Sequence, residues 1–291
     1  MKVLLINPKI SLDWARSPTC PLGLLSIASY LIEKGHTVKI FDHMVSSENI
    51  ENYIKAFSPD IVGLSVISPM ASADAIKISK FAKKLNIPVV WGGHITSALP
   101  ELVFKEGCVD FIVIGEGEIT FTALLDSIEN GSSYYDVDGL AFVDNYGIHI
   151  NKCREFSDLS TFPIIDWSLV DPRKYFQFFF GCKKMIYVYF SKGCPAKCTF
   201  CNNPNFHRST HRKRPPEHIV SEIEYLYKNY GIDAVNFADE YWNPGKENLQ
   251  KFLHLMKERN LNIMWGIQTR LGTFSKEELK QMHDAGCRWV L

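Results

Sequence analysis

Short apolar runs alternate with helical stretches along most of this 291-residue chain, and this alternation constrains its fold class. In the first part, the expected strands are residues 2–7, 37–41, 60–65, 88–91 and 111–114. The expected helices are residues 21–34, 50–57, 71–85 and 120–129. Because strands separated by helices pair in parallel, we expect an α/β fold with helices on both faces of a parallel sheet.

The alternation returns after a less regular stretch. The expected strands there are residues 185–190, 233–237, 263–268 and 287–291, and the expected helices are residues 216–229, 246–259 and 275–285. Three strand–helix units and a further strand make about half of an eightfold (β/α) barrel. Since an apolar strand is a poor place for a chain to end, we expect the natural protein to be longer and the barrel to be truncated here.

The two series of strands divide the chain into parts. We expect a first domain at residues 1–135, a linker with a short hairpin at residues 136–184, and half a barrel at residues 185–291. The hairpin would turn at Asn145 to Gly147. The aromatic run at residues 176–180 is expected to be a packing surface.

Three cysteines follow the first strand of the second series. Cys194, Cys198 and Cys201 have the spacing CxxxCxxC, and three thiolates this close together can hold one face of an iron–sulfur cluster. A cubane has four irons, so one iron is left without a protein ligand. An open iron can bind a substrate or cofactor, as the open position of a catalytic zinc site does. The spacing therefore indicates an enzyme instead of a simple electron carrier.

Ligands of parallel sheets bind beyond the carboxyl ends of the strands. In the first part of the chain these ends are expected at residues 7–8, 65–69, 92–94 and 115–118. Three of the four carry Gly or small polar residues, where a backbone can approach a ligand closely. They indicate a binding edge, although glycines that only serve turns would give the same pattern.

Charge and composition exclude several classes of protein. Lys+Arg and Asp+Glu both number 32, so nothing indicates a nucleic-acid partner. The one basic run, residues 207–214, is expected to be a solvated loop, with an anion contact as its functional alternative. The apolar run near Met1 is too short for a signal peptide, and no apolar stretch approaches the roughly 20 residues that span a bilayer. The other cysteines are scattered, which predicts reduced thiols and a cytoplasmic location.

The loop from Ser191 to Cys201 resembles the cluster loop of radical S-adenosylmethionine (SAM) enzymes. This family binds a 4Fe-4S cluster through CxxxCxxC after the first strand of a partial, TIM-like barrel. The resemblance implies that Asp239 and Glu240, at the end of the second strand of this series, contact the amino group of SAM. It implies a further SAM contact at Arg270, at the end of the third strand.

The first half of the chain resembles the Rossmann-like cobalamin-binding domain that is fused to one large class of these enzymes. The matching stretches are residues 21–25, 33–38, 59–65, 91–94 and 114–120. The resemblance implies a set of cobalamin contacts at Ser65, Gly92, Gly93, His94, Gly115, Glu116 and Gly117. The DxHxxG motif that gives many cobalamin proteins a histidine ligand of cobalt is absent after the first strand, where residues 7–13 stand instead. The resemblance then implies cobalamin held without that histidine, or a domain that has lost its ligand.

Together the resemblances imply a cobalamin-dependent radical SAM enzyme. Reductive cleavage of SAM at the 4Fe-4S cluster would give a 5′-deoxyadenosyl radical, and methylcobalamin would methylate an unactivated carbon, with two SAM molecules used per turnover. The protein would position these cofactors and exclude water. A reductant such as flavodoxin or ferredoxin is implied, and the substrate, a small molecule or a peptide, is not marked by any motif, nor is a catalytic residue.

Other interpretations stay open at this point. Cobalamin could be a bystander in an oxidative cyclase or a rearrangement enzyme. The chain could also be a non-enzymatic ligand-binding module in which the three cysteines and His207 bind zinc. Single residues carry alternatives too: His94 could ligate cobalt or bond a turn, Asp239 and Glu240 could be solvated carboxylates, and Arg270 could form a surface ion pair.

Overall fold

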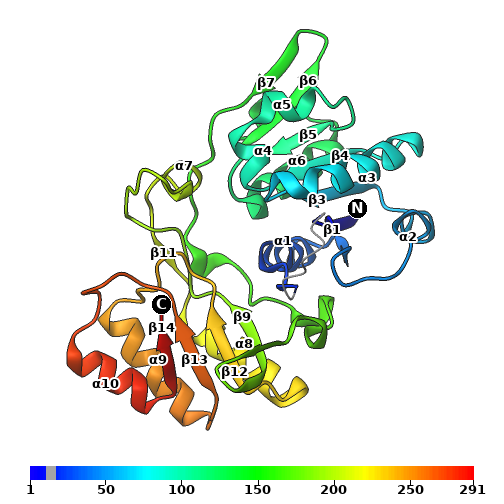
Figure 1. The fold of residues 1–291 in the computed structure, drawn as a ribbon. Coiled ribbons are helices and arrows are strands. Elements are labelled where there is room, and N and C mark those ends of the chain that lie inside the picture. The colour runs from blue at the N-terminus through cyan, green and yellow to red at the C-terminus, as the bar shows by residue number, and fades with distance from the viewer. Residues whose placement is uncertain (11–17) are drawn as a thin grey trace. The chain divides into compact units, whose positions relative to one another are not determined.

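The structure, a computed structural model, describes residues 1–10 and 18–291 (Figure 1). These residues form two compact units. The first contains residues 1–10 and 23–156, and the second contains residues 18–22 and 157–291. In the described ranges, no helix is long and apolar enough to cross a membrane.

The first unit is built on a seven-stranded sheet with the order β2-β1-β3-β4-β5-β6-β7. Its strands are β1 (Lys2–Asn7), β2 (Thr37–Asp42), β3 (Ile61–Ser65), β4 (Val89–Gly92), β5 (Phe111–Val113), β6 (Leu140–Asp144) and β7 (Gly147–Ile150). The pairs among the first five strands are all parallel, as the alternation predicted. Residues 7–13, which stand where the histidine motif would be, lie partly outside the described residues.

Helices cover both faces of this sheet. They are α1 (Leu22–Glu33), α2 (Ile50–Phe57), α3 (Ser72–Lys84), α4 (His94–Ala98), α5 (Pro100–Phe104) and α6 (Gly117–Asn130). On one face, Leu4 and Ile6 share a core cluster with Ile54 of α2 and Ile78 of α3. On the other face, Phe121 of α6 lies over the centre of the sheet at Gly63 of β3. Successive residues of a strand point to opposite faces, so the continuous apolar run of β1 supplies both layers.

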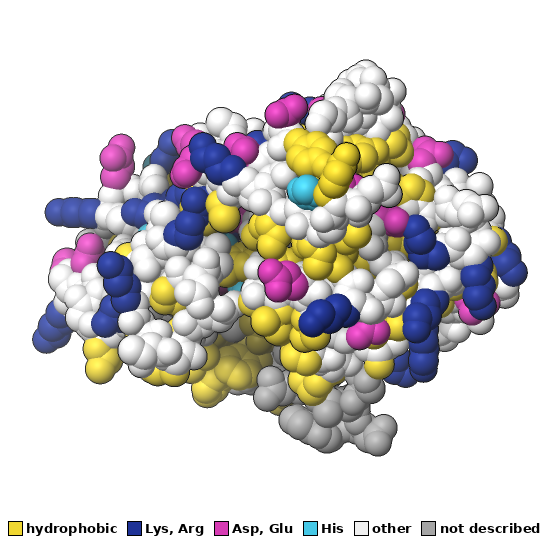
Figure 2. Space-filling model, turned by 90° about the horizontal axis from the view of Figure 1, so that it is seen from above, with side chains coloured by type: hydrophobic (Ala, Val, Ile, Leu, Met, Phe, Trp, Pro, Cys, Tyr) yellow, Lys and Arg dark blue, Asp and Glu magenta, His cyan; other side chains and the backbone are white. Residues whose placement is uncertain are grey.

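The hairpin expected in the linker is part of the first sheet. β6 pairs antiparallel with β5, Phe111 opposite Phe142, and β7 pairs antiparallel with β6. Tyr134 packs edge-on against Phe111, with ring centroids 5.0 Å apart, which adds an aromatic contact to the pairing. The first unit therefore extends to residue 156 instead of 135. Hydrophobic side chains gather on the face seen from above (Figure 2), and the hairpin contributes exposed Tyr146 and Ile148 to the surface.

The second unit contains a five-stranded sheet with the order β14-β13-β12-β9-β8. Its strands are β8 (Gln177–Phe179), β9 (Cys182–Val188), β12 (Ala234–Phe237), β13 (Met264–Ile267) and β14 (Cys287–Val290), with helices α8 (Pro216–Tyr230), α9 (Lys246–Glu258) and α10 (Lys276–Asp284). β9, β12, β13 and β14 pair in parallel as expected. β8 was not expected as a strand: it lies antiparallel to β9, so the sheet is mixed, and it does not close in the described part of the chain.

Short 3₁₀ turns complete the described elements. They are Pro69–Ala71, Tyr134–Asp136, Leu159–Thr161, Trp167–Leu169 and Pro172–Tyr175. Each follows a Ser or Asp whose side chain accepts a hydrogen bond from the backbone two residues on, as in Asp166 with Ser168. The last three of these turns order part of the stretch between the two expected domains, which carries no periodic pattern.

The two faces of the second sheet are packed differently. On one face, Phe237 and Trp265 join Phe252 of α9 in an aromatic cluster, with ring centroids 5.4–6.2 Å apart. On the other face, the indole of Trp289 lies across Gly266, and its Nε1 donates to Asn236 Oδ1 at 2.9 Å. A Cβ atom at Gly266 would lie 1.6 Å from Trp289 Nε1, so only glycine leaves room for the ring.

At the amino ends of the strands, the same face is filled by the β8–β9 connection. Phe179 packs edge-on against Trp289 at 5.3 Å between ring centroids, and Phe180 stacks on it at 5.9 Å. Cys182 and Ala234, the first residues of β9 and β12, share this cluster. Of the aromatic run expected as a packing surface, Phe179 therefore packs against Trp289, whereas Phe178 and Phe180 are 74% and 70% exposed.

We expect the substitution Gly266→Ala to destabilise the second unit. The added methyl group would force the Trp289 indole off its site, and overpacking of a buried site costs about 1–3 kcal/mol. Chemical denaturation, followed by tryptophan fluorescence, would measure the loss.

Gly23→Ala is the matched control for this prediction. Gly23 lies in the first turn of α1, and a Cβ atom added there would have no neighbouring atom within 4 Å. Alanine at this position should therefore leave stability unchanged or raise it by up to about 1 kcal/mol. Equal stability of the two variants would contradict the packing role of Gly266.

Candidate functional site

The three cysteines lie in one loop whose base is closed by a small ribbon. β10 (Ser191–Lys192) pairs antiparallel with β11 (Arg212–Lys213), so the residues between them form a closed excursion at the carboxyl end of β9. This cluster loop, residues 193–211, carries the single-turn helix α7 (Asn203–Phe206). The ribbon and α7 are too short to have a sequence signature. The structure thus places the cysteines at the end of the strand where the sequence predicted them.

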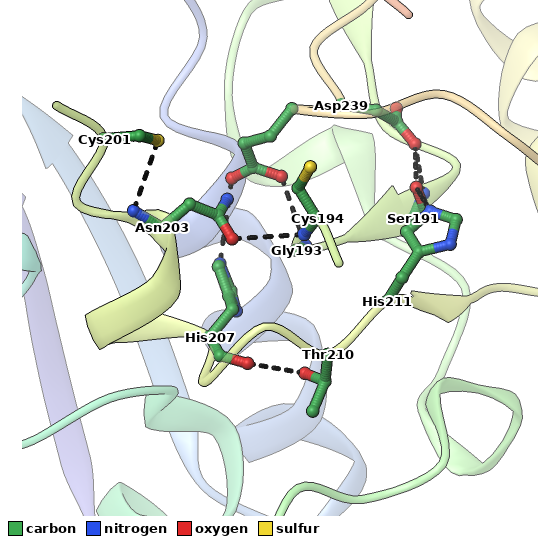
Figure 3. A network of polar contacts seen from close by, with 10 residues as sticks. Ser191, Gly193, Cys194, Cys201, Asn203, His207, Thr210, His211 and Asp239 are labelled. Atoms are coloured by element: carbon green, nitrogen blue, oxygen red, sulfur yellow. Dashed lines mark hydrogen bonds and ion pairs between the residues drawn. The ribbon is translucent and has the colours of Figure 1, made fainter. Parts of the chain in front are cut away.

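Asn203 ties the two ends of the cysteine motif together (Figure 3). Its Oδ1 accepts a hydrogen bond from the backbone N–H of Cys194 at 3.1 Å, and its own backbone N–H donates to Cys201 Sγ at 3.4 Å. The backbone N–H of Cys201 donates to the carbonyl oxygen of Cys198 at 3.1 Å. These bonds hold the first and last cysteines of the motif close to α7.

The three cysteines are accessible to a polynuclear cluster. Cys194 and Cys198 are half-buried and Cys201 is exposed, so all three sulfur atoms are within reach of a bound group. Among residues 1–10 and 18–291, no three His, Cys, Asp or Glu side chains converge as the ligands of one ion do. In a cubane each thiolate binds a different iron, so the three need not meet at one point.

Gly193 allows the loop to start in a space without room for a side chain. Its φ is +84°, in the left-handed region, and a Cβ atom there would lie 2.4 Å from the carbonyl oxygen of Thr210 and 3.0 Å from His207 Cβ. The residue before the first cysteine is therefore held against the far arm of the same loop.

Glu240 faces the start of the cluster loop. Its Oε2 accepts a hydrogen bond from the backbone N–H of Gly193 at 3.2 Å, and its Oε1 lies 3.7 Å from Nε2 of buried His207. The side chain is 42% exposed. Because a carboxylate has about four acceptor positions, Glu240 can accept a further cationic donor beside the loop.

Asp239, the neighbouring carboxyl group, has a different environment. It is 1% exposed, its Oδ2 accepts from the backbone N–H of Phe190 at 2.9 Å, and its Oδ1 accepts from the backbone N–H and the hydroxyl of Ser191, both at 2.5 Å. Burial raises the pKa of Asp239 to about 7, although the hydrogen bonds from Ser191 and Phe190 oppose the shift. The two acidic residues thus have different roles: Asp239 binds the backbone at the end of β9, and Glu240 is exposed beside the loop.

The last residue of the basic run is not solvated. Arg214 is buried in an ion pair with Glu222 of α8, and its Nη1 also donates to the carbonyl oxygen of Tyr189 at 3.0 Å. Glu222 Oε1 accepts from the backbone N–H of Ile165 at 3.0 Å. This pair fastens the stretch before β9 to the strand that carries the cluster loop, and sequence reasoning missed it. Nothing in the spacing of the two residues marks them as partners.

Arg270 lies at the same edge of the sheet as the two acidic residues. It follows β13, the parallel neighbour of β12, and is exposed. Its carbonyl oxygen accepts from the backbone N–H of Thr273 at 3.2 Å, which fixes the turn after β13. The structure therefore brings the expected SAM-contact residues to one edge, with Asp239 buried beneath it.

The expected cobalamin contacts also meet at one edge, that of the first sheet. Ser65 pairs with Gly92, and Gly92 with Val113, so the ends of β3, β4 and β5 are adjacent. Gly93 has a φ of +116°, and a Cβ atom there would lie 2.7 Å from the carbonyl oxygen of Val66. This is a close approach between two loops that only glycine permits.

Other residues of this set serve the fold around the edge. His94 begins α4, Glu116 precedes α6, and the backbone N–H of Gly115 donates to Ser97 Oγ at 2.9 Å. Gly117 packs against α1, where a Cβ atom would lie 2.6 Å from Ile27 Cδ1. The glycine at position 117 is thus explained by packing between α6 and α1.

Apolar side chains are exposed at the same edge. Ile67 and Met70 follow β3, and Leu99 follows α4 after β4; all three are between 44% and 53% exposed. A glycine-lined edge flanked by exposed apolar groups fits a large planar macrocycle such as a corrin, which needs close backbone approach and apolar contact.

Family models match both units. The B12 binding domain matches residues 9–125, and the radical SAM superfamily matches residues 188–291. The second match covers the cluster loop, and the first covers the glycine-lined edge. A 4Fe-4S cluster and SAM follow from the radical SAM domain, and cobalamin follows from the B12-binding domain, so the zinc-module interpretation is not favoured.

Several curated proteins are similar to most of this chain. An uncharacterised methyltransferase of Pyrococcus horikoshii is 31% identical over 100% of this chain and 64% of the relative. An anaerobic magnesium-protoporphyrin IX monomethyl ester cyclase of Synechocystis is 32% identical over 90% of this chain and 54% of the relative. Cytidylyl-2-hydroxyethylphosphonate methyltransferase of Streptomyces wedmorensis is 26% identical over 99% of this chain and 64% of the relative. The chain spans between half and two thirds of these proteins.

Two solved structures have the same fold. The radical SAM methyltransferase TsrM of Kitasatospora setae, with cobalamin and a 4Fe-4S cluster bound, matches 99% of this chain and 58% of its own with a TM-score of 0.78 at 19% identity. The cobalamin-dependent SAM radical enzyme OxsB, with aqua-cobalamin and SAM bound, matches 99% of this chain and 43% of its own with a TM-score of 0.82 at 20% identity. The chain therefore combines a B12-binding domain with a radical SAM domain.

Proposed function

We propose that the protein containing this chain is a cobalamin-dependent methyltransferase that acts on an unactivated carbon. The observation that carries the proposal is the cysteine loop at the end of β9, with Glu240 beside its start, in a chain that also contains a B12-binding domain. Two of the three relatives described above are methyltransferases, which favours methyl transfer over cyclisation.

In this proposal each group of residues has one task. Cys194, Cys198 and Cys201 hold three irons of the cluster, and Glu240 and Arg270 contact the amino and carboxylate groups of SAM. The edge formed by Ser65, Gly92, Gly93, His94, Gly115, Glu116 and Gly117 holds cobalamin. When bound, the cluster supplies the electron that cleaves SAM, and cobalamin supplies the methyl group.

The sheet of the second unit is the first half of a (β/α) barrel in this proposal. Its support is the one-sided packing: α9 covers the face of Phe237 and Trp265, whereas the opposite face carries Trp289 and Asn236. An open α/β sheet has helices on both faces, but a barrel has them only outside.

The reaction also requires partners. We infer a reductant such as flavodoxin or ferredoxin, because the cluster must receive an electron. The substrate is a small molecule or a peptide, and the reducing conditions that such a cluster needs favour a cytoplasmic location.

We expect Cys198→Ala to abolish 5′-deoxyadenosine formation. Alanine removes one of three thiolates, so the cluster loses a ligand that no other residue in the motif replaces. The product would be quantified after anaerobic reconstitution, with dithionite and SAM. Cys153→Ala is the matched control, because Cys153 is an exposed cysteine of the first unit. Wild-type product levels in the Cys198 variant would refute the mechanism.

We expect Gly93→Ala to weaken cobalamin binding by about tenfold or more. The methyl group would push the loop after β4 away from Val66 and spread the edge on which cobalamin is held. A visible absorption titration under anaerobic conditions would give the dissociation constant. Gly107→Ala is matched, because Gly107 also has a positive φ, of +65°, but has open space around it and precedes β5 at its amino end.

We expect S-adenosylhomocysteine to form only when cobalamin is present. A methyltransferase uses a second SAM to supply the methyl group, whereas a cyclase that does not transfer methyl groups makes no S-adenosylhomocysteine. Chromatography of reactions with and without cobalamin separates the two functions. A cobalamin-bound enzyme that forms 5′-deoxyadenosine but no S-adenosylhomocysteine would favour the cyclase.

A further inference from the structure

We propose that Asp239 positions the cluster loop instead of contacting SAM, and that it shares a titrating proton with His211 through the hydroxyl of Ser191. The inference rests on the proposed function, because it treats residues 193–211 as the loop that holds the cluster. It gives a role to the hydrogen-bond network of Ser191, His211 and Asp239, none of which has to contact a cofactor.

The contacts of Asp239 are those of a positioning residue. Both carboxylate oxygens are engaged by the backbone N–H groups of Phe190 and Ser191, where β9 ends and the ribbon begins. Ser191 is three residues before Cys194, so these bonds set where the loop starts. With 1% of its surface exposed, Asp239 offers almost no surface at which a SAM ammonium group could reach it. Glu240 needs no such rearrangement.

The hydroxyl of Ser191 joins Asp239 to His211. Ser191 Oγ lies 2.5 Å from Asp239 Oδ1 and 2.9 Å from His211 Nε2, so one hydroxyl bridges a carboxyl group and an imidazole (Figure 3). In one arrangement, His211 is an imidazolium, its Nε2–H donates to Ser191 Oγ, and the hydroxyl donates to the ionised carboxylate. In the other, the protonated carboxyl donates to Ser191 Oγ, which donates to bare Nε2 of a neutral imidazole that keeps its proton on Nδ1. One proton moves from nitrogen to oxygen in two balanced transfers.

The surroundings favour the neutral arrangement. Burial raises the pKa of Asp239 and lowers the pKa of His211. Glu240 raises the pKa of Asp239 further. Lys213 lowers the pKa of His211, the Tyr241 backbone and Glu240 oppose this with smaller effects, and Arg212 adds the smallest lowering effect. Arg214, which is buried with Glu222, interacts electrostatically with Asp239: the charge of Asp239 is one of the effects that raise the pKa of Arg214. The carboxyl group can therefore gain and lose its proton near neutral pH.

The charge of Asp239 should affect the cluster. An ionised carboxylate behind the start of the loop disfavours an added electron, whereas a protonated one does not. The midpoint potential of the cluster should therefore fall as pH rises through about 7, the pKa of Asp239.

The test uses anaerobically reconstituted wild-type protein and four variants. Ser191→Ala removes the bridge but keeps both backbone bonds to Asp239, Ser191→Thr keeps the hydroxyl, Asp239→Asn removes the titrating group, and Glu240→Gln removes the open carboxylate. Midpoint potentials are measured by electron paramagnetic resonance between pH 6 and 8.5, and SAM dissociation constants by equilibrium dialysis.

The inference makes separate demands on each variant. Ser191→Ala should move the pH midpoint of the potential upward by about one unit, because it removes one hydrogen bond from the ionised carboxylate, and Ser191→Thr should restore it. Asp239→Asn should abolish this pH dependence and change SAM affinity by less than about threefold. Glu240→Gln should weaken SAM binding by about tenfold and leave the pH dependence intact.

Two outcomes would overturn the inference. If the pH midpoint of the potential is unchanged in Ser191→Ala, the hydroxyl of Ser191 does not couple to the titration of Asp239. If Asp239→Asn loses as much SAM affinity as Glu240→Gln, Asp239 is a SAM contact. If Asp239→Asn does not fold, the comparison of Ser191→Ala with Ser191→Thr still tests the network.

A measurement without cofactors separates this inference from the proposed function. The pKa of Asp239 is higher in the folded protein than its ordinary value of 3.8 in an unfolded chain, so the folded state binds the proton more tightly. The melting temperature of cofactor-free wild type should therefore fall relative to Asp239→Asn as pH rises from 5 through 7. Parallel curves would refute the titration of Asp239, even if SAM is cleaved; a wild type that holds no cluster but shows this fall would refute only the proposed function.

Discussion

The cysteine loop depends on a buried carboxyl group behind it. Asp239 reaches from the end of β12 to the backbone at Phe190 and Ser191, where β9 leaves the sheet. Unpaired N–H groups at a buried strand end would each cost about 1–3 kcal/mol, and a carboxyl acceptor satisfies two of them at once. Arg214 supports the same point from the other side, because its backbone N–H donates to the carbonyl oxygen of Phe190. The start of the loop is therefore fixed by groups that never touch the cluster.

Both units use the same geometric rule for different cofactors. Parallel strands bring their carboxyl ends to one edge, so loops that are far apart in sequence meet there. In the first unit the edge is made of backbone and small residues, with Gly93 as the closest approach. In the second unit it is made of charged and sulfur-bearing side chains. In the proposed function this difference follows the chemistry of the ligands: a broad macrocycle needs room, whereas a cluster and an ammonium group need donors of electron pairs.

The sequence predicted the elements whose apolar pattern is long enough to be periodic. The parallel strands and the long helices are such elements. Because β9 was among them, the position of the cysteines after this strand could be predicted too. The two-residue strands β10 and β11 and the three-residue strand β8 have no period to detect. Asp239 and Glu240 look equivalent in the sequence, because their difference in burial arises only when β9 and β12 pair. The partnership of Arg214 with Glu222 likewise requires α8 to turn back over the strand.

The aromatic contact between the β8–β9 connection and Trp289 has a consequence for how such a domain can evolve. Phe179, Cys182 and Ala234 pack together at the amino ends of strands of the second sheet, on the face that also carries Trp289. Substitutions there change how firmly the sheet is packed, whereas substitutions in the loops at the opposite ends change what can be bound. A lineage can therefore exchange substrates by altering loops while the packed end preserves the fold, so that closely similar domains come to serve methyl transfer in one protein and ring closure in another.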